Sequence, residues 1–135
     1  MVSTEERKRI AEIMALPNSV FVFGSNLAGV HGAGAAKVAA MHYGAVRGQG
    51  SGMAGRSYAI PTKGSWRDPV GLPLSDIEVF VQTFIRYAYG HPIHLFAVTR
   101  IGCGYAGYTD RQIAPLFSDA PPNCILPPEW ESIRF

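Results

Sequence analysis

The sequence predicts an α/β domain with a mainly parallel or mixed β-sheet flanked by helices on both faces. Short apolar runs alternate with helical patterns, which is typical of this class. The chain has 135 residues, enough for one domain, and 47% of them are hydrophobic against 16% charged, which favours a packed core. We expect a single domain over residues 1–135, with an N-terminal helix at 1–16 and a C-terminal tail at 127–135.

The first half of the chain predicts two helices and two strands. A helix over 3–16 is expected to open with a capping box formed by Ser3 and Glu6. Glycine marks the turns that follow, because it adopts backbone conformations closed to other residues. The expected order is a strand at 20–23, a glycine-rich turn at 29–34, a helix at 35–43, a loop at 45–55 and a strand at 57–61.

The second half begins with a loop at 62–73 and the clearest helix. Ser75 and Glu78 predict its capping box, and apolar residues from Ile77 to Ala88 fall on one face at helical spacing. Beyond it we expect a strand at 93–98, a loop at 101–108, a short helix capped by Thr109 and Gln112, and a strand at 124–126. Ligands bind beyond the carboxyl ends of parallel strands, so residues 25–26, 62–63 and 100–108 should meet at one rim.

Charge is distributed unevenly along the chain. The net charge is +2, yet residues 13–67 contain five Lys or Arg and no acid. A glycine-rich segment without acids suits a small anionic ligand, although ordinary variation in loop charge would also produce it. The small net charge does not favour a nucleic-acid partner. No apolar run approaches the roughly 18–20 residues of a membrane span, and the N-terminus lacks the apolar stretch of a signal peptide, so we expect a cytoplasmic protein without a membrane partner.

Two glycine-rich loops predict contacts to phosphate. Gly32–Ala36 opens a helix after a strand, where backbone N–H groups reach a phosphate unobstructed by Cβ atoms. Close packing of this helix on the sheet is the alternative interpretation. Gly102–Gly107 satisfies G-x-G-x-x-G, and Glu129 follows at roughly the distance of a dinucleotide-binding acid. The chain after Gly107 is too short to complete a dinucleotide-binding domain, so we interpret this segment as a second phosphate loop.

Lys63 is the most informative single residue. It ends a strand at the expected rim, where its amine can neutralise a phosphate, act as a nucleophile if desolvated, or remain solvated. Cys103 has no His or acid close in sequence to activate it, which favours a small buried residue. His31 in the first glycine loop is either a ligand contact or a surface residue. Three aromatic residues could stack on a base or pack a loop: Trp66, Tyr105 and Tyr108.

No metal site is predicted. His91 and His94 stand near the start of the strand expected at 93–98, which should direct them to opposite faces. Cys103 and Cys124 form neither a zinc spacing nor a disulfide framework.

Taken together, four segments resemble a macro domain: Gly32-Ala-Gly34 with its helix, Tyr58–Lys63, the amphipathic helix after Ser75, and Thr99-Arg-Ile-Gly-Cys-Gly104. More narrowly, they resemble the branch that contains terminal ADP-ribose protein glycohydrolase. The resemblance covers about residues 20–126, most of the chain. The run N-L-A-G-V-H-G-A-G-A-A-K at 26–37 is also similar to a group of short bacterial and phage-associated proteins.

The resemblance implies a pocket for ADP-ribose, with the pyrophosphate between residues 32–36 and 102–108. It also implies that Lys63 is the amine that attacks the distal ribose of an ADP-ribosylated carboxylate. The aspartate of that mechanism should stand where this chain has Ala106, which leaves Asp110 as a substitute. The family's adenine-binding aspartate has no obvious counterpart, so Ser25 or Asn26 would have to serve.

We therefore expect a module that binds ADP-ribose or an ADP-ribosylated target without a cofactor. De-ADP-ribosylation by a hydrolase using Lys63 and Asp110 is one alternative, and binding of NAD or another nucleotide through 102–107 is another. The expected ligand contacts are Ser25, Asn26, His31, Gly32, Ala33, Gly34, Ala35, Thr62, Arg100, Ile101, Gly102, Cys103, Gly104, Tyr105, Ala106, Gly107 and Tyr108.

Overall fold

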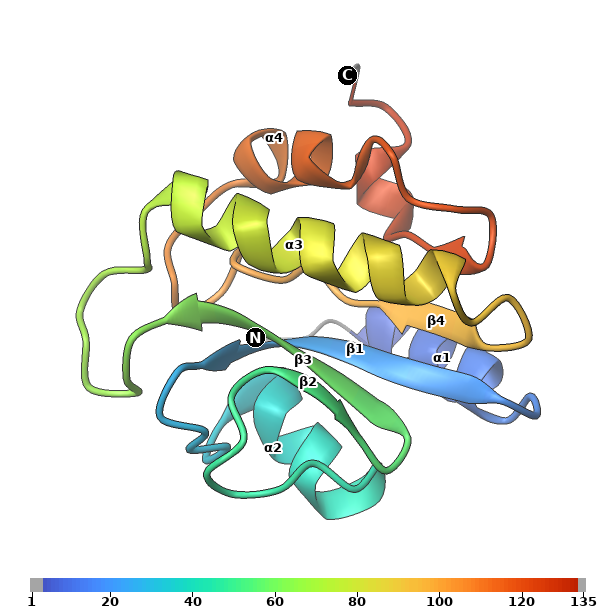
Figure 1. The fold of residues 1–135 in the computed structure, drawn as a ribbon, viewed down its shortest axis with the longest axis horizontal. Coiled ribbons are helices and arrows are strands. Elements are labelled where there is room, and N and C mark those ends of the chain that lie inside the picture. The colour runs from blue at the N-terminus through green and yellow to red at the C-terminus, as the bar shows by residue number, and fades with distance from the viewer. Residues whose placement is uncertain (1–3, 134–135) are drawn as a thin grey trace.

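A five-stranded mixed sheet forms the centre of the molecule (Figure 1), in a computed structural model that describes residues 4–133. The strand order is β2-β3-β1-β4-β5. All neighbouring strands are parallel except β2, which pairs antiparallel with β3. The bounds are β1 (Ser19–Asn26), β2 (Gly52–Ala54), β3 (Ser57–Lys63), β4 (Leu95–Val98) and β5 (Cys124–Ile125).

Helices cover both faces of this sheet, which confirms the predicted fold class. On one face lie α1 (Thr4–Met14) and α2 (Gly34–His42), packed on a smaller core. On the other lie α3 (Leu74–Tyr89) and α4 (Asp110–Ile113), followed by 3₁₀ turns at Ala114–Phe117 and Pro128–Trp130. The two layers give each face of the parallel strands an apolar cover.

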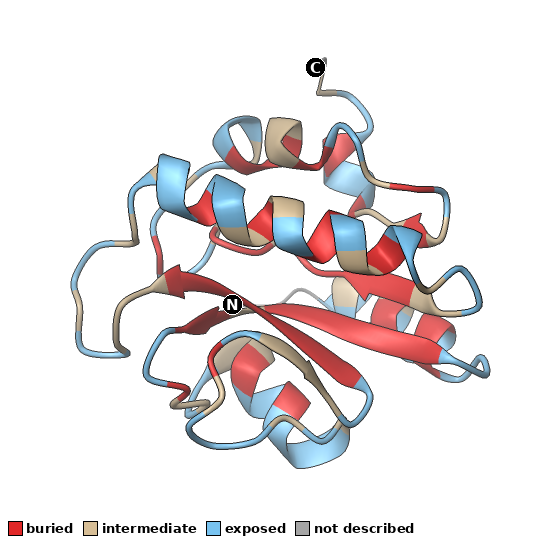
Figure 2. Cartoon of the chain, in the orientation of Figure 1, coloured by how far each residue is buried: buried red, intermediate tan, exposed pale blue. Residues whose placement is uncertain are grey.

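Helix α3 contributes more buried residues to the larger core than any other element. Its residues Ile77, Val81, Phe84, Ile85 and Ala88 are all buried, at the helical spacing predicted from the sequence. The Phe84 ring meets Tyr58 of β3 and Phe96 of β4 edge-on, with centroids 5.0 and 5.3 Å apart. Figure 2 shows this buried stripe facing the sheet and an exposed face turned outward. These contacts pack α3 against β3 and β4, the two neighbours of β1.

Strand β1 is longer than the run predicted at 20–23. It pairs with β3 on one side and β4 on the other, and all its residues except Gly24 are buried. The apolar part of a central parallel strand is recognisable in the sequence as a continuous hydrophobic run. Its polar end, residues 24–26, has the composition of a loop, so the sequence did not predict it as strand. This extension carries Ser25 and Asn26 to the carboxyl edge of the sheet, beside Lys63 at the end of β3.

The expected loop at 45–55 contains a strand, so that prediction was wrong. β2 (Gly52–Ala54) pairs with Ala59, Tyr58 and Ser57 of β3, and a turn at Gly55, with a positive φ of 57°, connects the two strands. Residues 52–54 carry no β-branched side chain that would indicate a strand. Pairing with the exposed edge of β3 decides their conformation.

Two helix starts differ from expectation in different ways. The Ser75–Glu78 capping box is absent, because the N-cap of α3 is Pro73, two residues before Ser75. The Ser3–Glu6 box involves a residue outside the part of the chain that the structure describes. By contrast, the Thr109–Gln112 box is present, with the Thr109 N–H donating to Gln112 Oε1 at 2.9 Å.

His91 and His94 do not lie on opposite faces of a strand, contrary to the prediction. β4 begins only at Leu95, and the two imidazole rings stack with centroids 5.8 Å apart in the turn after α3. His91 also stacks on Tyr87 at 3.9 Å. Strand alternation does not apply in a turn, which is why the spacing rule failed here.

The described part of the C-terminal tail, residues 127–133, is anchored to the core by Trp130. Trp130 is buried against Phe117, with ring centroids 5.1 Å apart.

Among residues 4–133 no helix has the length and apolar content required to cross a bilayer.

Candidate functional site

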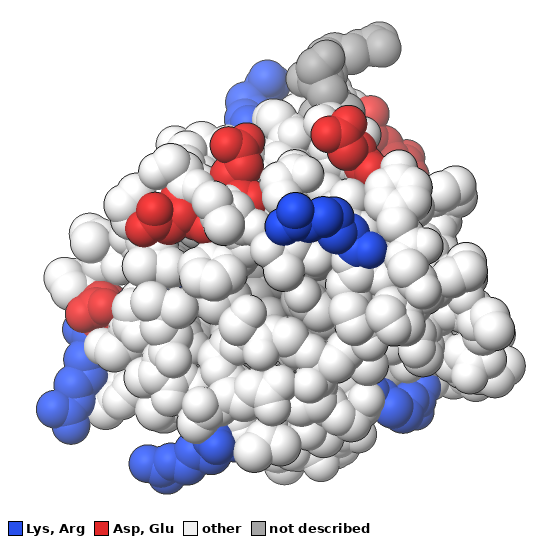
Figure 3. Space-filling view, in the orientation of Figure 1, with Lys and Arg blue, Asp and Glu red and all other residues white. Residues whose placement is uncertain are grey.

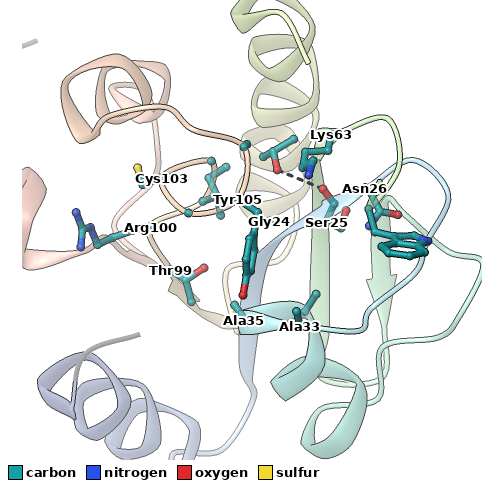
Figure 4. A pocket seen from close by; sticks show the side chains of 18 of the residues that line it. Gly24, Ser25, Asn26, Ala33, Ala35, Lys63, Thr99, Arg100, Cys103 and Tyr105 are labelled. Carbon is teal, nitrogen blue, oxygen red and sulfur yellow. Dashed lines mark hydrogen bonds between the residues drawn. The ribbon is translucent and has the colours of Figure 1, made fainter. Parts of the chain in front are cut away.

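A pocket of about 630 Å³ opens at the carboxyl ends of β1, β3 and β4, where the sequence predicts the ligand rim. Its volume is in the range of small-molecule sites. In Figure 4 residues from α2 and the β4–α4 loop stand on opposite sides of the strand ends. Its walls are formed by Glu6, Gly24–Asn26, Val30, Gly32–Ala36, Thr62, Lys63, Trp66 and Thr99–Ala106.

The first glycine loop ends in the N-terminus of α2. The helix begins at Gly34, whose φ of +59° is in the left-handed region that favours glycine. Ala33 at the cap has an extended conformation and contributes no side-chain hydrogen bond to the helix. The backbone N–H groups of the first turn therefore lack the side-chain oxygen that commonly caps them, on the same segment that lines the pocket.

The second glycine loop, residues 102–106, faces the first one directly. A Cβ placed on Gly34 would lie only 3.1 Å from Cε2 of Tyr105. Tyr105 is 69% exposed, so this aromatic ring lies at the surface of the pocket and not in the core. The absence of a side chain at Gly34 allows the two loops to approach this closely.

Most uncharged polar side chains of the walls are satisfied by the protein itself. Asn26 donates from Nδ2 to the Val30 carbonyl at 2.9 Å and accepts from the Val30 N–H at 3.0 Å. Thr62 Oγ1 donates to the Ser25 carbonyl at 3.2 Å, and Thr99 Oγ1 donates to the Val22 carbonyl at 2.8 Å. Ser25 Oγ donates to the Gly50 carbonyl. These side chains shape the pocket and hold its loops.

An ion pair between Arg100 and Asp110 fixes the ends of the second loop. Arg100 donates from Nε to Asp110 Oδ1 at 3.0 Å and from Nη2 to Oδ2 at 2.6 Å. Trp130 Nε1 donates to the same Oδ1 at 2.8 Å. The hydrogen bond from Arg100 lowers the pKa of the Asp110 carboxyl, and Asp110 in turn raises the pKa of the guanidinium. This bidentate pair ties the start of the loop to α4.

Cys103 has an acidic neighbour after all, which corrects the expectation drawn from its sequence surroundings. Its Sγ donates to Asp110 Oδ1 at 3.4 Å. Burial, and next the nearby Asp110 carboxylate, raise the pKa of the thiol to about 12. The neighbour therefore suppresses the thiolate instead of activating it.

We expect Cys103 to react slowly with iodoacetamide at pH 7.5, because less than about one thiol in 1,000 is ionised when the pKa lies more than three units above the pH. The alkylation rate, followed by mass spectrometry of the tryptic peptide, should rise with pH. Asp110→Asn removes the carboxylate charge and should accelerate the reaction at pH 7.5. A rate equal to that of free cysteine in the wild type would contradict this account.

The structure brings most of the predicted site residues to one pocket. Ser25, Asn26, Gly32–Ala35, Thr62, Lys63 and Arg100–Ala106 all line it. Four other candidates are absent from the pocket lining: His31, Gly107, Tyr108 and Asp110. His31 Nε2 lies 3.1 Å from the carbonyl oxygens of Val46 and Gln49, and Tyr108 donates its hydroxyl to the Leu72 carbonyl.

Sequence reasoning missed several wall residues, of which Glu6 is the most important. Glu6 lies on α1, more than 90 positions from the second loop in sequence, and it is the only acidic residue among the described residues of the wall. Its position in an amphipathic helix gave no local signal of a pocket. The other missed residues are Gly24, Val30 and Thr99, whereas Ala36 belongs to the predicted phosphate loop and Trp66 was predicted only as a stacking or loop-packing residue.

The fold and the site define this chain as an α/β protein with a small-molecule pocket at the carboxyl edge of its sheet. Comparison with known proteins assigns it no family: no family model matches, and neither a curated protein nor a solved structure shows a significant match. Within residues 4–133 no group of three or more His, Cys, Asp or Glu side chains could hold a metal ion.

Proposed function

We propose that the protein binds ADP-ribose, or the ADP-ribosyl group of a modified target, in the pocket between the two glycine loops. The observation that carries this proposal is the approach of the loops, in which Tyr105 lies over Gly34 at the N-terminus of α2. A helix N-terminus and a glycine-rich loop on opposite sides of a pocket are both suited to offer backbone N–H groups to a pyrophosphate.

The distribution of polar groups supports an anionic ligand. Asn26, Thr62 and Thr99 already use their side chains within the protein. Backbone amides, the amine of Lys63 and the guanidinium of Arg100 therefore remain as the main donors for a ligand. We place the protein in the cytoplasm as part of the same proposal, because Cys103 and Cys124 are free thiols, as a reducing compartment favours.

Calorimetric titration with ADP-ribose, NAD and AMP tests the proposal. We expect a dissociation constant in the micromolar range for ADP-ribose, about −8 kcal/mol at 1 μM, and weaker binding of the other two. Tighter binding of intact NAD would favour the nucleotide-binding alternative through residues 102–107. Absence of heat with all three ligands would contradict the proposal.

Hydrolysis of an ADP-ribosyl bond is a second candidate, supported by the presence of Lys63 in the pocket wall. Its amine would attack the anomeric carbon of the distal ribose and lose a proton, and the carboxylate of the target would leave; water would then displace the lysine and release ADP-ribose. Asp110 accepts hydrogen bonds from Arg100 and Trp130, and its carboxylate is not part of the pocket lining. The support for this candidate therefore comes from Lys63 and not from Asp110.

If the protein is such a hydrolase, Lys63→Ala should lower turnover of a protein ADP-ribosylated on glutamate by about 1,000-fold or more, because the nucleophile is lost. Affinity for ADP-ribose should change by only a few-fold, since the backbone amides remain. Lys37→Ala is the matched control, because Lys37 is exposed on α2 outside the pocket lining. Equal turnover of Lys63→Ala and wild type would exclude the role of this lysine.

A further inference from the structure

A second, smaller hollow of about 220 Å³ lies beside the start of α3. Its walls are Leu27, Leu72, Asp76, Val79 and Phe80, and we name this set the α3 groove. Two of its aliphatic side chains are unusually open to solvent: Leu27 is 50% exposed and Val79 is 62% exposed. Exposed apolar side chains that line one hollow favour an interaction surface over isolated surface residues.

The α3 groove adjoins the ligand pocket through the end of β3. The Leu27 N–H donates to the Lys63 carbonyl at 2.9 Å, and the Leu72 N–H donates to the Thr62 carbonyl at 2.7 Å. Thr62 and Lys63 in turn line the pocket. A single strand end therefore separates the two, so a molecule that extends out of the pocket at Lys63 can reach the groove.

The negative charge around the α3 groove favours some classes of ligand over others. Between residues 68 and 85 the chain carries Asp68, Asp76 and Glu78 and neither Lys nor Arg. Asp76 is itself part of the groove wall. Figure 3 shows acidic side chains over the end of the molecule where α3 begins. These carboxylates repel the phosphates of a nucleic acid and attract the cationic side chains of a polypeptide.

We propose that the α3 groove binds the polypeptide to which ADP-ribose is attached. The segment it fits has an aliphatic side chain, such as leucine, close to the modified residue, with a Lys or Arg beside it. An extended chain covers about 3.3 Å per residue, so an aliphatic residue four positions away lies within about 13 Å of the modification, and we take this as the range to test. This inference rests on the proposed ADP-ribose pocket, and it makes a protein-linked group the preferred ligand.

The test compares free ADP-ribose with two peptides that carry ADP-ribose through the same non-hydrolysable linkage. The first peptide has Leu and Arg within four residues of the modification, and the second has Ser at both positions. We expect calorimetry to show the first peptide binding wild type about tenfold more tightly than free ADP-ribose, because partial burial of one leucine side chain is sufficient for that gain. The second peptide should bind like free ADP-ribose.

Two variants locate the effect. Val79→Lys places a cation in the α3 groove and should remove the tenfold advantage of the first peptide while free ADP-ribose binds within about twofold of wild type. Met41→Lys is the matched control, because Met41 is a 64% exposed apolar residue on α2, outside both hollows. It should leave both affinities unchanged.

The possible failures are distinguishable. If wild type binds free ADP-ribose but gains nothing from Leu and Arg, or if Val79→Lys keeps the gain, the groove proposal is overturned and the pocket stands. An ADP-ribosylated single-stranded oligonucleotide that binds more tightly than the first peptide also overturns it. If wild type binds neither free nor linked ADP-ribose, the proposed function fails and the groove proposal fails with it.

Discussion

Replacing Gly34 with glutamate is expected to lower the affinity for ADP-ribose by about 100-fold or more, equivalent to roughly 2.7 kcal/mol. The new Cβ would stand 3.1 Å from the Tyr105 ring, and φ at this position is +59°, which costs a residue with a side chain about 1–2 kcal/mol. The carboxylate would lie at the N-terminus of α2, in the place proposed for the pyrophosphate. Calorimetric titration with ADP-ribose measures the loss.

The control for Gly34→Glu is Gly48→Glu. Gly48 also has a positive φ, of 92°, and no atom lies within 4 Å of an added Cβ, but this glycine is not part of the pocket lining. Gly48→Glu should share the backbone strain and the added charge and still bind ADP-ribose like wild type. If Gly34→Glu is folded by circular dichroism and binds normally, the assignment of this loop to the pyrophosphate is incorrect.

Asp110→Ala is expected to lower the free energy of unfolding by about 2 kcal/mol, because Trp130 and Arg100 lose their acceptor in a half-buried site. The carboxylate receives hydrogen bonds from Arg100, Trp130 and Cys103, which come from the second loop and the C-terminal tail. The loop would lose its anchor, so affinity for ADP-ribose should fall by about tenfold. Urea denaturation and titration measure the two effects.

The stability difference between wild type and Asp110→Ala should depend on pH, which tests whether the charge of Asp110 is responsible for it. Pairing lowers the pKa of Asp110 below its usual value of about 4, so its stabilisation is complete above that pH and disappears as the pH falls through the lowered pKa. The difference in stability between wild type and Asp110→Ala should therefore be largest near pH 7 and shrink in acid. Asp110→Asn, which keeps an acceptor for Trp130, should lie between the two. A difference that stays constant from pH 7 to pH 2 would show that the ion pair does not stabilise the fold.

The location of the pocket could be predicted because it follows from local patterns. The apolar runs that become β1, β3 and β4 are followed directly by residues 25–26, 62–63 and 99–106, which form the rim. Parallel strands bring their carboxyl ends to the same edge, so their order in the sheet was not needed. Glycine at 32, 34, 102 and 104 indicated the two loops before their partners were known.

Glu6 and Asp110 could not be assigned from the chain alone. Glu6 lies in a helix whose pattern indicates only an amphipathic surface, and contact of α1 with β1 and β4 brings it to the pocket. The macro-domain resemblance suggested Asp110 as a substitute for a catalytic aspartate, but Arg100 and Trp130 engage its carboxylate. The neighbours of a side chain come largely from segments distant in sequence, and the spacing of residues along the chain does not reveal them.

Hydrophobic periodicity and glycine positions act over short stretches of chain, so the α/β class, the apolar face of α3 and the rim with the two glycine loops follow from local sequence. Three other features depend on contacts distant in sequence: residues 52–54 form a strand, Tyr105 lies over Gly34, and Asp110 anchors the second loop. Residues 52–54 have low strand propensity, but they pair because the edge of β3 offers free backbone hydrogen-bonding groups. The partly buried donors of Arg100 and Trp130 need an acceptor, and the fold brings the Asp110 carboxylate to them.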